Sequence, residues 1–398
     1  MKILFALSIG FDKGGPSVHL LTDVIESALK RGHSCHVVLK KTTDSAVNGL
    51  EKLSEKFGDL LSLSLIKDTA NKKCGFVKRY LRDCSYAIKC RKFYKKNKYD
   101  VAFLQSSNVA WVYMGFFKRM KCPVVYNVQD IFPQNLYFSG QLPFSKITYP
   151  VFCGLQNAAY KRAGRIITIS HDMKQTLVEQ KIDADKIDVV FNWSYGDGDI
   201  RLENIPKECV FDLNADPKKV NVVYAGNIGK MQNVELIAEA ARLSKDDSSV
   251  HYYIIGDGAN KAKVLSITEG LDNVTILPMQ PSRYAESIYA QADINVIPLA
   301  KGGIKTALPS KTATVLRTDR PIIFCIDPGS ALEKQLKDSF NVKIADNSNA
   351  QSLLGAMREL RDFNENKGDG RDEIRNTFSR NNANKYVDVM EGVSHINK

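Results

Sequence analysis

Two lysine-bearing turns are the segments of this chain best suited to binding an anionic substrate. The first, Tyr224-Ala225-Gly226-Asn227-Ile228-Gly229-Lys230, ends an apolar run, and a helix is expected from Asn233. The second, Leu308-Pro309-Ser310-Lys311, precedes a short apolar helix. Glycine lets a ligand approach the backbone, and the N–H groups at a helix start attract a diphosphate together with a lysine. These turns therefore predict diphosphate binding, with a solvent-facing lysine in a tight turn as the alternative for Lys230.

Two further glycine turns have less specific patterns. Gly14-Gly15-Pro16 separates the apolar run Ile3–Leu7 from a helix that begins at Ser17, and no full Gly-x-Gly-x-x-Gly is present. Gly256-Asp257-Gly258 follows another apolar run, where a turn capped by the aspartate is an equal alternative to ligand contact.

The polar sequence Asn127-Val128-Gln129-Asp130 follows the apolar run Val124–Tyr126. A carboxylate at a strand end can orient a sugar hydroxyl or assist proton transfer, so Asp130 is a candidate catalytic residue. The alternative is an aspartate that caps a helix or turn. Asn192-Trp193, which ends a later apolar run, is predicted to be a structural corner.

Apolar runs alternate with helical periodicity through the first half of the chain. Runs of Val and Ile without polar alternation are typical of parallel strands covered on both faces, so the pattern predicts an α/β, doubly wound sheet. The expected strands are Ile3–Leu7, His36–Leu39, Val101–Leu104, Val124–Tyr126, Ile166–Ile169 and Val189–Phe191. The expected helices are Ser17–Lys30, Val77–Tyr94, Val109–Arg119, Ser145–Arg162 and Met173–Glu179.

The same alternation restarts after a polar segment that contains Gly196, Gly198, Pro206 and Pro217. The expected strands are Val220–Ala225, His251–Ile255, Val274–Leu277, Ile294–Pro298, Pro321–Ile326 and Val342–Ala345, and the expected helices include Val234–Leu243, Ser282–Gln291 and Ser352–Leu360. We therefore predict Rossmann-like domains over 1–195 and 219–370, a linker over 196–218, and a cleft between the two sheets. Apolar residues at helical spacing predict an amphipathic helix within the tail, 371–398, that packs on another part of the chain.

The charge of the chain is concentrated in one segment. The 398 residues have a net charge of +12, and residues 72–98 contain eleven basic residues and one acid, Asp83. A protein that coats nucleic acid over a uniformly basic surface is therefore disfavoured. No apolar run is long enough to span a membrane, and the N-terminal apolar stretch is too short for a signal peptide. Eight scattered Cys and six His without metal-ligand spacing predict reduced thiols and no metal or cofactor.

The order of these motifs resembles that of retaining GT-B glycosyltransferases of family 4. The resemblance covers nearly the whole chain, and each motif alone is weak. Besides the turns already described, it rests on Arg31-Gly32-His33, Ile169-Ser170, Asn192-Trp193, Ala292-Asp293 and Pro321-Ile322-Ile323. The Asn-x-Gln-Asp and Pro-Ser-Lys versions are most similar to the branch that builds bacterial O-antigen and capsule repeats, which includes transferases of N-acetylfucosamine and related amino sugars.

The resemblance implies that the first domain holds an acceptor and the second a nucleotide-sugar donor, for which UDP is the commonest base choice. Leu277 would lie near the base, and Gly15 near the transferred sugar or the diphosphate. The donor-binding residues that it implies are Gly15, Gly226, Asn227, Gly229, Asp257, Gly258, Leu277, Pro309, Ser310 and Thr314. Gly14 and Gln129 are the acceptor-side candidates, and Asp130, Lys230 and Lys311 are the catalytic candidates.

The family implies transfer of the sugar with retention of anomeric configuration. Lysines at the leaving diphosphate would stabilise its developing charge without a metal ion, and Asp130 would orient the acceptor or the sugar. Four positions depart from the family pattern. Thr306 and Thr314 stand where many members have a Glu-x7-Glu pair, Gln129 stands where many have His, and Asn227 replaces the usual Arg.

Three other functions remain as alternatives. A nucleotide-sugar epimerase of the same fold would need an acid/base pair of carboxylates and histidine in the cleft, which this sequence supplies poorly. A non-catalytic sugar-nucleotide-binding protein is favoured by the two missing glutamates. A nucleic-acid binder rests only on the basic segment, without aromatic side chains arranged for stacking.

The basic segment has an apolar stripe of its own. Val77, Leu81, Cys84 and Ile88 repeat at three- and four-residue steps, with most of the lysines and arginines off this stripe. A solvated charged face is the simpler interpretation. Because the family's acceptors are lipid-linked saccharides at the cytoplasmic membrane face, the resemblance implies a cytoplasmic protein that docks peripherally on the membrane through the Lys72–Lys98 helix.

Overall fold

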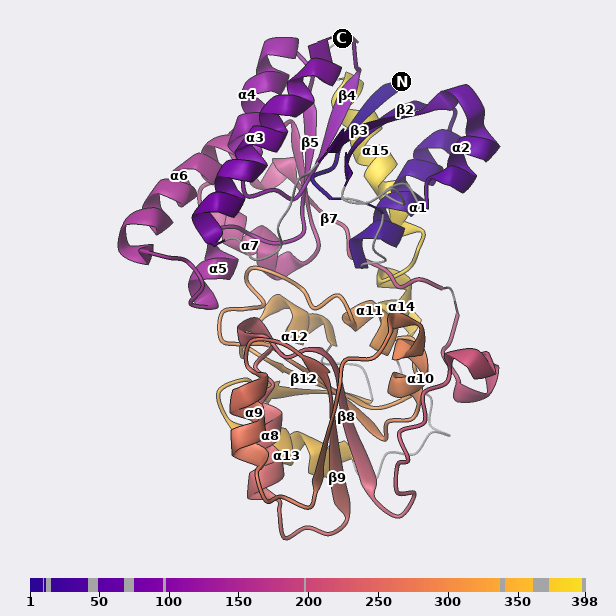
Figure 1. Ribbon diagram of the computed structural model, residues 1–398, viewed down its shortest axis with the longest axis vertical. Helices are drawn as coiled ribbons and strands as arrows, with labels where there is room; N and C mark the ends of the chain where they lie inside the picture. Colours follow the sequence, from indigo (N-terminus) through magenta and orange to yellow (C-terminus); the bar gives the residue numbers. More distant parts are fainter. Residues whose placement is uncertain are drawn as a thin grey trace. The chain divides into compact units, whose positions relative to one another are not determined.

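The computed structural model describes residues 1–9, 11, 16–41, 49–67, 75–95, 98–196, 198–336, 341–360 and 372–395. The chain divides into two compact units (Figure 1). Unit 1 comprises Met1–Tyr137, Gln141–Asn192 and Arg380–Lys398, and unit 2 comprises Phe138–Gly140 and Trp193–Ser379.

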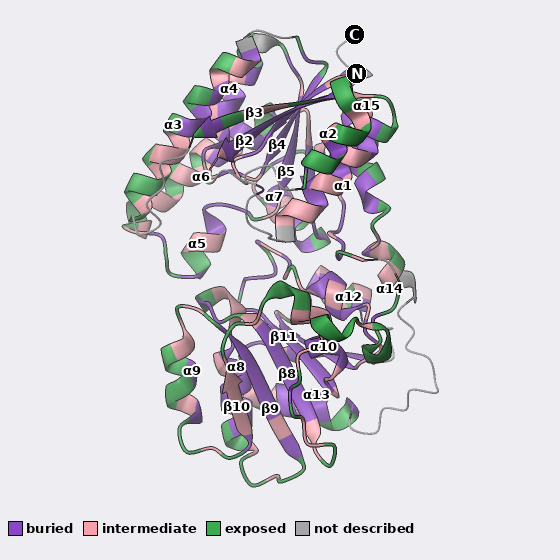
Figure 2. Ribbon diagram, turned by 45° about the vertical axis from the view of Figure 1, so that its right-hand side comes forward, coloured by how far each residue is buried: buried purple, intermediate pink, exposed green. Residues whose placement is uncertain are grey.

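Unit 1 contains a seven-stranded parallel sheet with the order β3-β2-β1-β4-β5-β6-β7. Its inner strands are buried along almost their whole length because helices cover both faces (Figure 2). The strands are β1 (Lys2–Ala6), β2 (Ser34–Lys41), β3 (Leu61–Lys67), β4 (Val101–Gln105), β5 (Val124–Val128), β6 (Arg165–Thr168) and β7 (Ile187–Val189).

The helices of unit 1 form two groups, which lie on opposite sides of the sheet (Figure 1). The first group is α1 (Pro16–Lys30), α2 (Glu51–Phe57) and α15 (Asn382–His395), and the second is α3 (Phe76–Lys95), α4 (Ala110–Met120) and α6 (Ser145–Arg162). The short helices α5 (Gln134–Phe138) and α7 (His171–Glu179) complete the connections. A Ser170 side chain that accepts from the Met173 N–H caps α7.

The C-terminal helix α15 is part of the core of unit 1. Tyr386 and Met390 are buried beside α1 and the central strands. Arg31 forms ion pairs with Asp388 (2.7 Å) and Glu391 (2.9 Å), and His33 bonds to Glu391 at 2.7 Å. The Arg31-Gly32-His33 sequence therefore holds the last helix of the chain.

Unit 2 contains a six-stranded parallel sheet with the order β10-β9-β8-β11-β12-β13. Its strands are β8 (Val220–Asn227), β9 (Val250–Asp257), β10 (Val274–Leu277), β11 (Ile294–Pro298), β12 (Ile322–Ile326) and β13 (Val342–Asp346). Its helices are α8 (Glu235–Leu243), α9 (Lys261–Thr268), α10 (Ala285–Ala290), α11 (Thr312–Val315), α12 (Ala331–Leu336), α13 (Ala350–Leu360) and α14 (Asp372–Thr377). The two doubly wound parallel sheets confirm the predicted α/β fold class.

Several elements differ from the prediction. Strand β3 was not expected because Leu and Ser alternate along this half-exposed edge strand. The last strand of unit 1 begins two residues before the expected Val189 and ends there. The predicted tail segment is divided between the units, since α14 belongs to unit 2 and α15 to unit 1.

The segment predicted as a linker is packed on unit 2. The Phe211 N–H donates to Ser287 Oγ (3.0 Å), and Gln291 Nε2 donates to the Phe211 carbonyl (2.6 Å). The Arg317 guanidinium donates to the Gly198 carbonyl (2.7 Å), and the Ile200 N–H donates to the Arg317 carbonyl. These bonds fix the segment because each satisfies a backbone group that a free linker would leave to water.

In the described parts of the chain, no helix is long and apolar enough to cross a bilayer. The seven cysteines that lie there are free thiols.

Candidate functional site

The strand order of unit 2 reverses direction between β8 and β11. At such a switch point the connections that leave the two strands diverge, and ligands of open parallel sheets bind beside the carboxyl ends of the strands. The turn after β8 and the segment from Leu299 to Lys311 after β11 both lie at this edge. With the end of β8, they contain half of the residues predicted to bind the donor, together with Lys230 and Lys311.

Lys311 is fixed against the end of β8. Its ammonium donates to the Ala225 carbonyl oxygen at 2.6 Å and lies over the Tyr224 ring, 3.7 Å from the centroid. Both contacts favour the charged amine, whereas desolvation by burial favours the neutral amine and lowers the pKa of Lys311 to about 7. The structure therefore places a titratable cation beside Gly226.

Gly226 makes room for this lysine. Its φ is +146°, and a Cβ atom there would lie 2.7 Å from Lys311 Nζ. Tyr224 supports the same turn, since its hydroxyl donates to the Asn227 carbonyl at 2.6 Å. Asn227 Nδ2 then donates to Gln232 Oε1 at 2.9 Å, directly beside Gly229.

The turns after β8 and β9 are joined to each other. The Ile228 N–H donates to the Asp257 carbonyl (2.8 Å), and a Cβ on Gly258 would lie 2.5 Å from the Ile228 carbonyl oxygen. The exposed Asp257 carboxylate accepts from the Gly258 N–H at 2.9 Å. The structure thus brings together Gly226, Asn227, Gly229, Asp257, Gly258 and Lys311, and Leu277 ends β10 opposite Ile255 at the same edge.

Lys230 is exposed, and the helix predicted over Val234–Leu243 follows it as α8. A 3-10 turn over Lys230–Gln232 intervenes, and α8 begins at Glu235. The N–H groups of Leu236 and Ile237 donate to the carbonyls of Asn233 and Val234. These two N–H groups are therefore not available to a ligand, and a diphosphate at this point would meet the Lys230 side chain and the turn backbone.

The Pro309-Ser310-Lys311 turn leads into the short helix that the sequence predicts. α11 is a single turn, and the Thr312 N–H donates to the Pro309 carbonyl at 3.0 Å. Ser310 is exposed and Thr314 is half-buried. Thr306 is fully buried and its hydroxyl donates to the Gly303 carbonyl, so it does not replace a carboxylate that faces a ligand.

Two residues at this edge were missed by the sequence reasoning. Tyr224 connects Lys311 to the Asn227 backbone, as described above. Asp327, which follows β12, accepts from the Gly302 N–H with both carboxylate oxygens (2.8 and 3.0 Å) and fixes the glycine turn after β11. Asp327 directly follows an apolar run and precedes Pro328-Gly329, a pattern that could have identified it.

In unit 1, a chain of side-chain amides joins the ends of β4 and β5. Gln129 Nε2 donates to Asn127 Oδ1 (3.0 Å) and to the Tyr386 hydroxyl (3.4 Å), and Gln129 Oε1 accepts from Asn192 Nδ2 (2.7 Å). Asn127 Nδ2 donates to Gln105 Oε1 at 2.8 Å. Both amide hydrogens of Gln129 are thus already bonded, and an acceptor would meet only its remaining oxygen lone pair.

Asp130 follows Gln129, and desolvation by the surrounding protein raises the pKa of its carboxyl. A raised pKa makes the carboxylate a better proton acceptor. Asn192 donates to Gln129 Oε1, and the Phe191 carbonyl accepts from Asn382 Nδ2 at 2.9 Å. Both contacts connect parts of unit 1 to each other. Gly14 and Gly15 lie outside the described residues.

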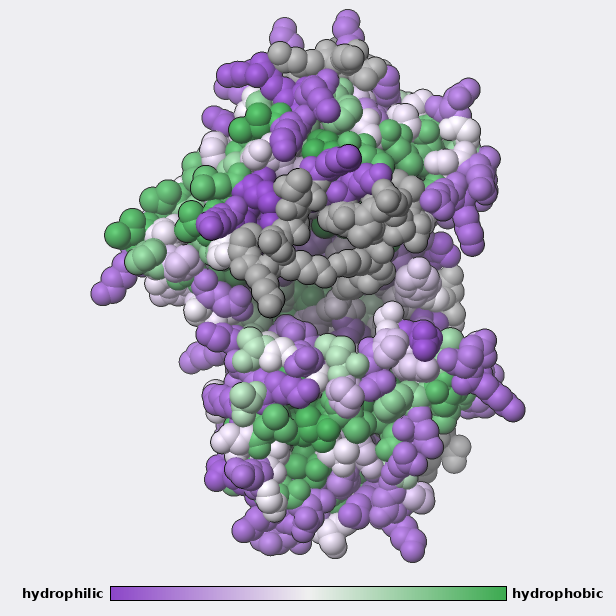
Figure 3. Space-filling model, viewed as in Figure 1, coloured by the Kyte–Doolittle hydropathy of each residue, from purple (hydrophilic) through white to green (hydrophobic). Residues whose placement is uncertain are grey.

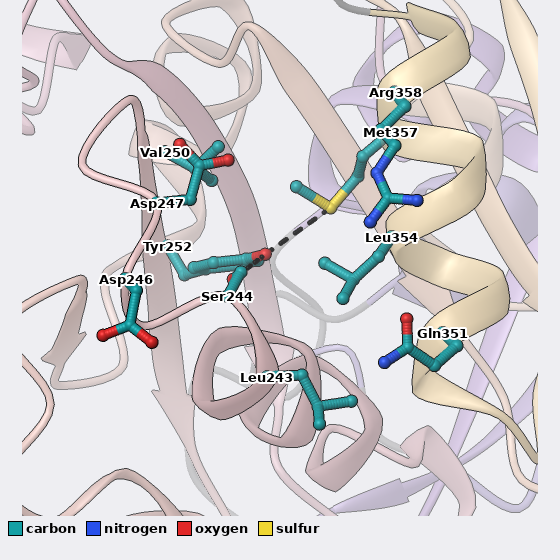
Figure 4. Close-up of a pocket in the computed structure, with 10 residues that line it drawn as sticks. All are labelled: Leu243, Ser244, Asp246, Asp247, Val250, Tyr252, Gln351, Leu354, Met357 and Arg358. Carbon is teal, nitrogen blue, oxygen red and sulfur yellow. Dashed lines mark hydrogen bonds between the residues drawn. The ribbon is translucent and has the colours of Figure 1, made fainter.

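A cavity of about 220 Å³ in unit 2 lies at the opposite edge of the sheet (Figure 4). It lies between the end of α8, the first residue of β9 and α13, and the Tyr252 hydroxyl donates to Met357 Sδ beside it (3.7 Å). None of the predicted site residues lines it. In the described residues, no group of three or more His, Cys, Asp or Glu side chains is placed to hold a metal ion.

Two family models match successive parts of the chain. Residues 14–193 match the model described as Glycosyltransferase Family 4, and residues 219–361 match the model described as Glycosyl transferases group 1. A crystal structure of Alr3699/HepE from Anabaena in complex with UDP and glucose matches the full chain with a TM-score of 0.61, at 14% identity over 100% of this chain and 97% of that one.

Two curated relatives match parts of the chain. One is a probable glycosyltransferase, WbjE, from Pseudomonas aeruginosa, with 24% identity over 53% of each chain. The other is a putative colanic acid biosynthesis glycosyl transferase, WcaI, from Escherichia coli, with 28% identity over 40% of each chain. The matches thus span about half or less of the length of these relatives.

The two Rossmann-like units, together with the structural likeness to the Anabaena protein, define a fold of the GT-B class. Within that class, the chain combines a glycosyltransferase family 4 domain with a group 1 glycosyltransferase domain. The residues gathered at the end of β8 lie in the second of these domains.

Gly256 allows the close approach of the β8 and β9 turns, and we expect Gly256→Ala to destabilise unit 2. An added Cβ would clash with the Gly226 carbonyl oxygen, a backbone atom that cannot move without shifting the β8 turn. The free energy of unfolding, measured with urea, should fall by about 2–3 kcal/mol. Gly355→Ala in α13 is the control, since its Cβ meets nothing within 4 Å, and it should raise stability by up to about 1 kcal/mol. Equal effects of the two substitutions would contradict the role of Gly256.

Proposed function

We propose that this protein transfers a sugar from a nucleotide sugar to a lipid-linked saccharide acceptor during synthesis of a bacterial surface polysaccharide. The observation on which this rests is the cationic turn at the switch point of the group 1 domain, where Lys311 lies beside Gly226 at the end of β8. A cation and a backbone free of side chains at the carboxyl end of parallel strands suit a donor diphosphate.

The comparisons support the donor and the pathway class. The Anabaena protein was solved with UDP and glucose, which favours a UDP-linked donor here. The Escherichia coli relative is named as a putative colanic acid biosynthesis glycosyl transferase, which favours a role in saccharide synthesis here. We propose an N-acetylated or deoxy amino sugar as the transferred group because of the Asn-x-Gln-Asp and Pro-Ser-Lys motifs.

The proposed reaction proceeds with retention. The bond between the anomeric carbon and the diphosphate oxygen breaks while the acceptor hydroxyl attacks from the same face, and the leaving phosphate oxygen takes the acceptor's proton. Lys230 and Lys311 stabilise the charge that develops on the diphosphate. Asp130, with its raised pKa, orients the acceptor or the sugar. The reaction as proposed uses no metal ion or cofactor.

The acceptor's lipid links the site to a membrane. A sugar on a lipid diphosphate remains at the bilayer surface, so the protein is proposed to work at the inner face of the cytoplasmic membrane. The Lys72–Lys98 segment of unit 1 has a net charge of +10 over its 27 residues. This charge favours binding to anionic lipid.

A thermal-shift screen with UDP-, GDP- and dTDP-sugars tests this function. A ligand that binds only the native state raises the melting temperature, and we expect UDP-sugars to give the largest rise. The same donors are then incubated with and without lipid-linked acceptor. Sugar transfer supports the proposal, interconversion of donor alone supports the epimerase alternative, and binding without either reaction supports a non-catalytic protein.

Lys230→Ala should lower turnover at least about tenfold, because one cation at the leaving diphosphate is lost. The measurement is the rate of sugar transfer at saturating donor. Lys245→Ala, an exposed lysine after α8, is the matched control and should leave the rate unchanged. A near-native rate for the Lys230 variant would remove this residue from the site.

Donor binding should take up protons through Lys311. The pKa of about 7 leaves the amine mostly neutral above pH 7 in the free protein, and a diphosphate beside it favours the charged form and raises this pKa. Calorimetric titration at pH ~8 in buffers of different ionisation enthalpy should therefore show uptake of up to about one proton, falling away below pH 7. Lys311→Met should abolish this uptake, whereas Lys245→Met should retain it. Equal uptake in both variants would show that another group is responsible.

A further inference from the structure

One side of unit 1 is strongly cationic. The helices α3, α4 and α6, called here the α3–α6 face, contain twelve basic residues and a single acid. That acid, Asp83, is already paired with Lys40 of β2 at 2.9 Å. The basic residues are Lys78, Arg79, Arg82, Lys89, Arg91, Lys92, Lys95, Lys118, Arg119, Lys146, Lys161 and Arg162.

The helices on the other side of the same sheet have the opposite balance. There α1, α2 and α15 contain four basic and six acidic residues. Several of the acids are bound to neighbouring cations, such as Asp388 to Arg31 and Glu26 to Lys30. The positive charge of unit 1 is therefore oriented toward one side and does not simply follow from a basic composition.

Exposed apolar side chains lie among these cations. Three belong to α3, two to the start of α6 and one to the residue just before α6, and each is 55–81% exposed. They are Val77, Leu81, Ile88, Phe144, Ile147 and Val151. Figure 3 shows hydrophobic residues interspersed with hydrophilic ones over this part of unit 1. A cluster of this kind marks an interaction surface more often than a solvated face.

The exposed apolar residues of α3 cannot face the core, because other residues occupy the buried side of this helix. The buried side of α3 is formed by Tyr86, Ala87, Cys90 and Tyr94. The Tyr86 hydroxyl donates to the Leu7 carbonyl at 3.1 Å, which fixes the rotation of the helix against β1. The stripe predicted from the sequence therefore exists, but it faces solvent.

The stripes of α3 and α6 lie side by side. The Phe152 ring of α6 packs on the rings of Phe76 (centroids 5.9 Å) and Tyr80 (4.9 Å) of α3. Val77 and Val151 are the direct chain neighbours of two of these rings, and both are exposed. The packed aromatic rings thus support a continuous apolar surface above them.

A groove of about 600 Å³ continues this surface at the edge strand β3. It combines apolar and cationic side chains from β3 and the second half of α3. They include Leu65, Ile66, Lys67, Ile88, Lys89 and Lys92.

We propose that the α3–α6 face inserts into the surface of a membrane that contains anionic lipid. The apolar stripes of α3 and α6 enter the boundary between headgroups and acyl chains, and the lysines and arginines around them bind lipid phosphates. This rests on the proposed function, and it specifies which side chains place unit 1 on the membrane that holds a lipid-linked acceptor.

Charge and chemistry favour a lipid surface over the other occupants. A second copy bound through the same face would bring twelve cations against twelve. A nucleic acid would satisfy the cations, but aliphatic side chains such as Leu81 and Ile147 gain nothing from a phosphate backbone. Only the lipid surface offers both anionic groups and an apolar interior.

Vesicle flotation with the full chain tests the proposal. The native protein should float with vesicles of phosphatidylethanolamine and phosphatidylglycerol, and much less with phosphatidylcholine alone. Lys89→Gln combined with Lys92→Gln should weaken binding at least about tenfold at low salt. Leu81→Ser combined with Ile147→Ser should weaken it by a similar factor, about tenfold, and should also abolish the binding that remains at high salt, since insertion is not screened.

Matched controls use the same substitutions elsewhere. Lys52→Gln with Lys385→Gln changes exposed lysines on the α1, α2 and α15 side, and Leu243→Ser with Leu265→Ser changes two half-exposed leucines of unit 2. Both control variants should bind vesicles as the native protein does. Failure of the native protein to bind anionic vesicles would overturn the proposal, and so would equal loss in test and control variants. Loss of a dimer in the Leu81 and Ile147 variant, or vesicle binding displaced by duplex DNA, would assign the face to another partner.

A second measurement separates this proposal from the proposed function. The thermal shift produced by UDP should be unchanged in all four variants, which also shows that each is folded. If UDP-sugars bind and vesicles do not, only the membrane proposal fails. If vesicles bind and no nucleotide sugar binds or reacts, only the proposed function fails.

Discussion

The bond from the Lys311 ammonium to the Ala225 carbonyl is the contact on which the geometry of the candidate site in unit 2 depends. It fixes the segment after β11 to the end of β8, the two strands at which the sheet order reverses. The bond requires a glycine at 226, because any side chain would displace the ammonium. Gly226 in turn requires a glycine at 256, whose Cβ would strike the Gly226 carbonyl. The lysine, whose pKa burial lowers to about 7, thus depends on two positions that admit no side chain, Gly226 and Gly256.

In unit 1, hydrogen bonds between side-chain amides connect the carboxyl ends of the strands β4 and β5. There the side-chain amides of Gln105, Asn127 and Gln129 bond to one another, and the Tyr386 hydroxyl from the last helix joins them. Because α15 is fixed by Arg31 and His33, the position of Gln129 depends on residues from both ends of the chain. Asp130 therefore projects from a rigid strand end, whereas Lys230 projects from an exposed turn.

Sequence periodicity predicted most strands and helices because buried parallel strands are continuous apolar runs. The glycine turns were also predictable, since their spacing after apolar runs is visible in the sequence. What the sequence could not reveal is the partner of each side chain. Nothing in the Pro309-Ser310-Lys311 motif indicates that Lys311 bonds to a carbonyl 86 residues earlier. The 3-10 turn over Lys230–Gln232, which ends at the left-handed Asn233 just before α8, was also not visible in the sequence.

In α3 the aliphatic residues have the predicted helical spacing, but they face away from the core. Apolar residues at helical spacing normally mark the buried side of a helix. In α3 that side is taken by tyrosines, an alanine and a cysteine, and the deeply buried Tyr94 has a pKa raised by desolvation. Both tyrosines, Tyr86 and Tyr94, are larger than any aliphatic residue, so the helix fills the core without its Val, Leu and Ile. The aliphatic residues of α3 are therefore exposed and surrounded by cations. This combination suits contact with a surface that is both apolar and anionic.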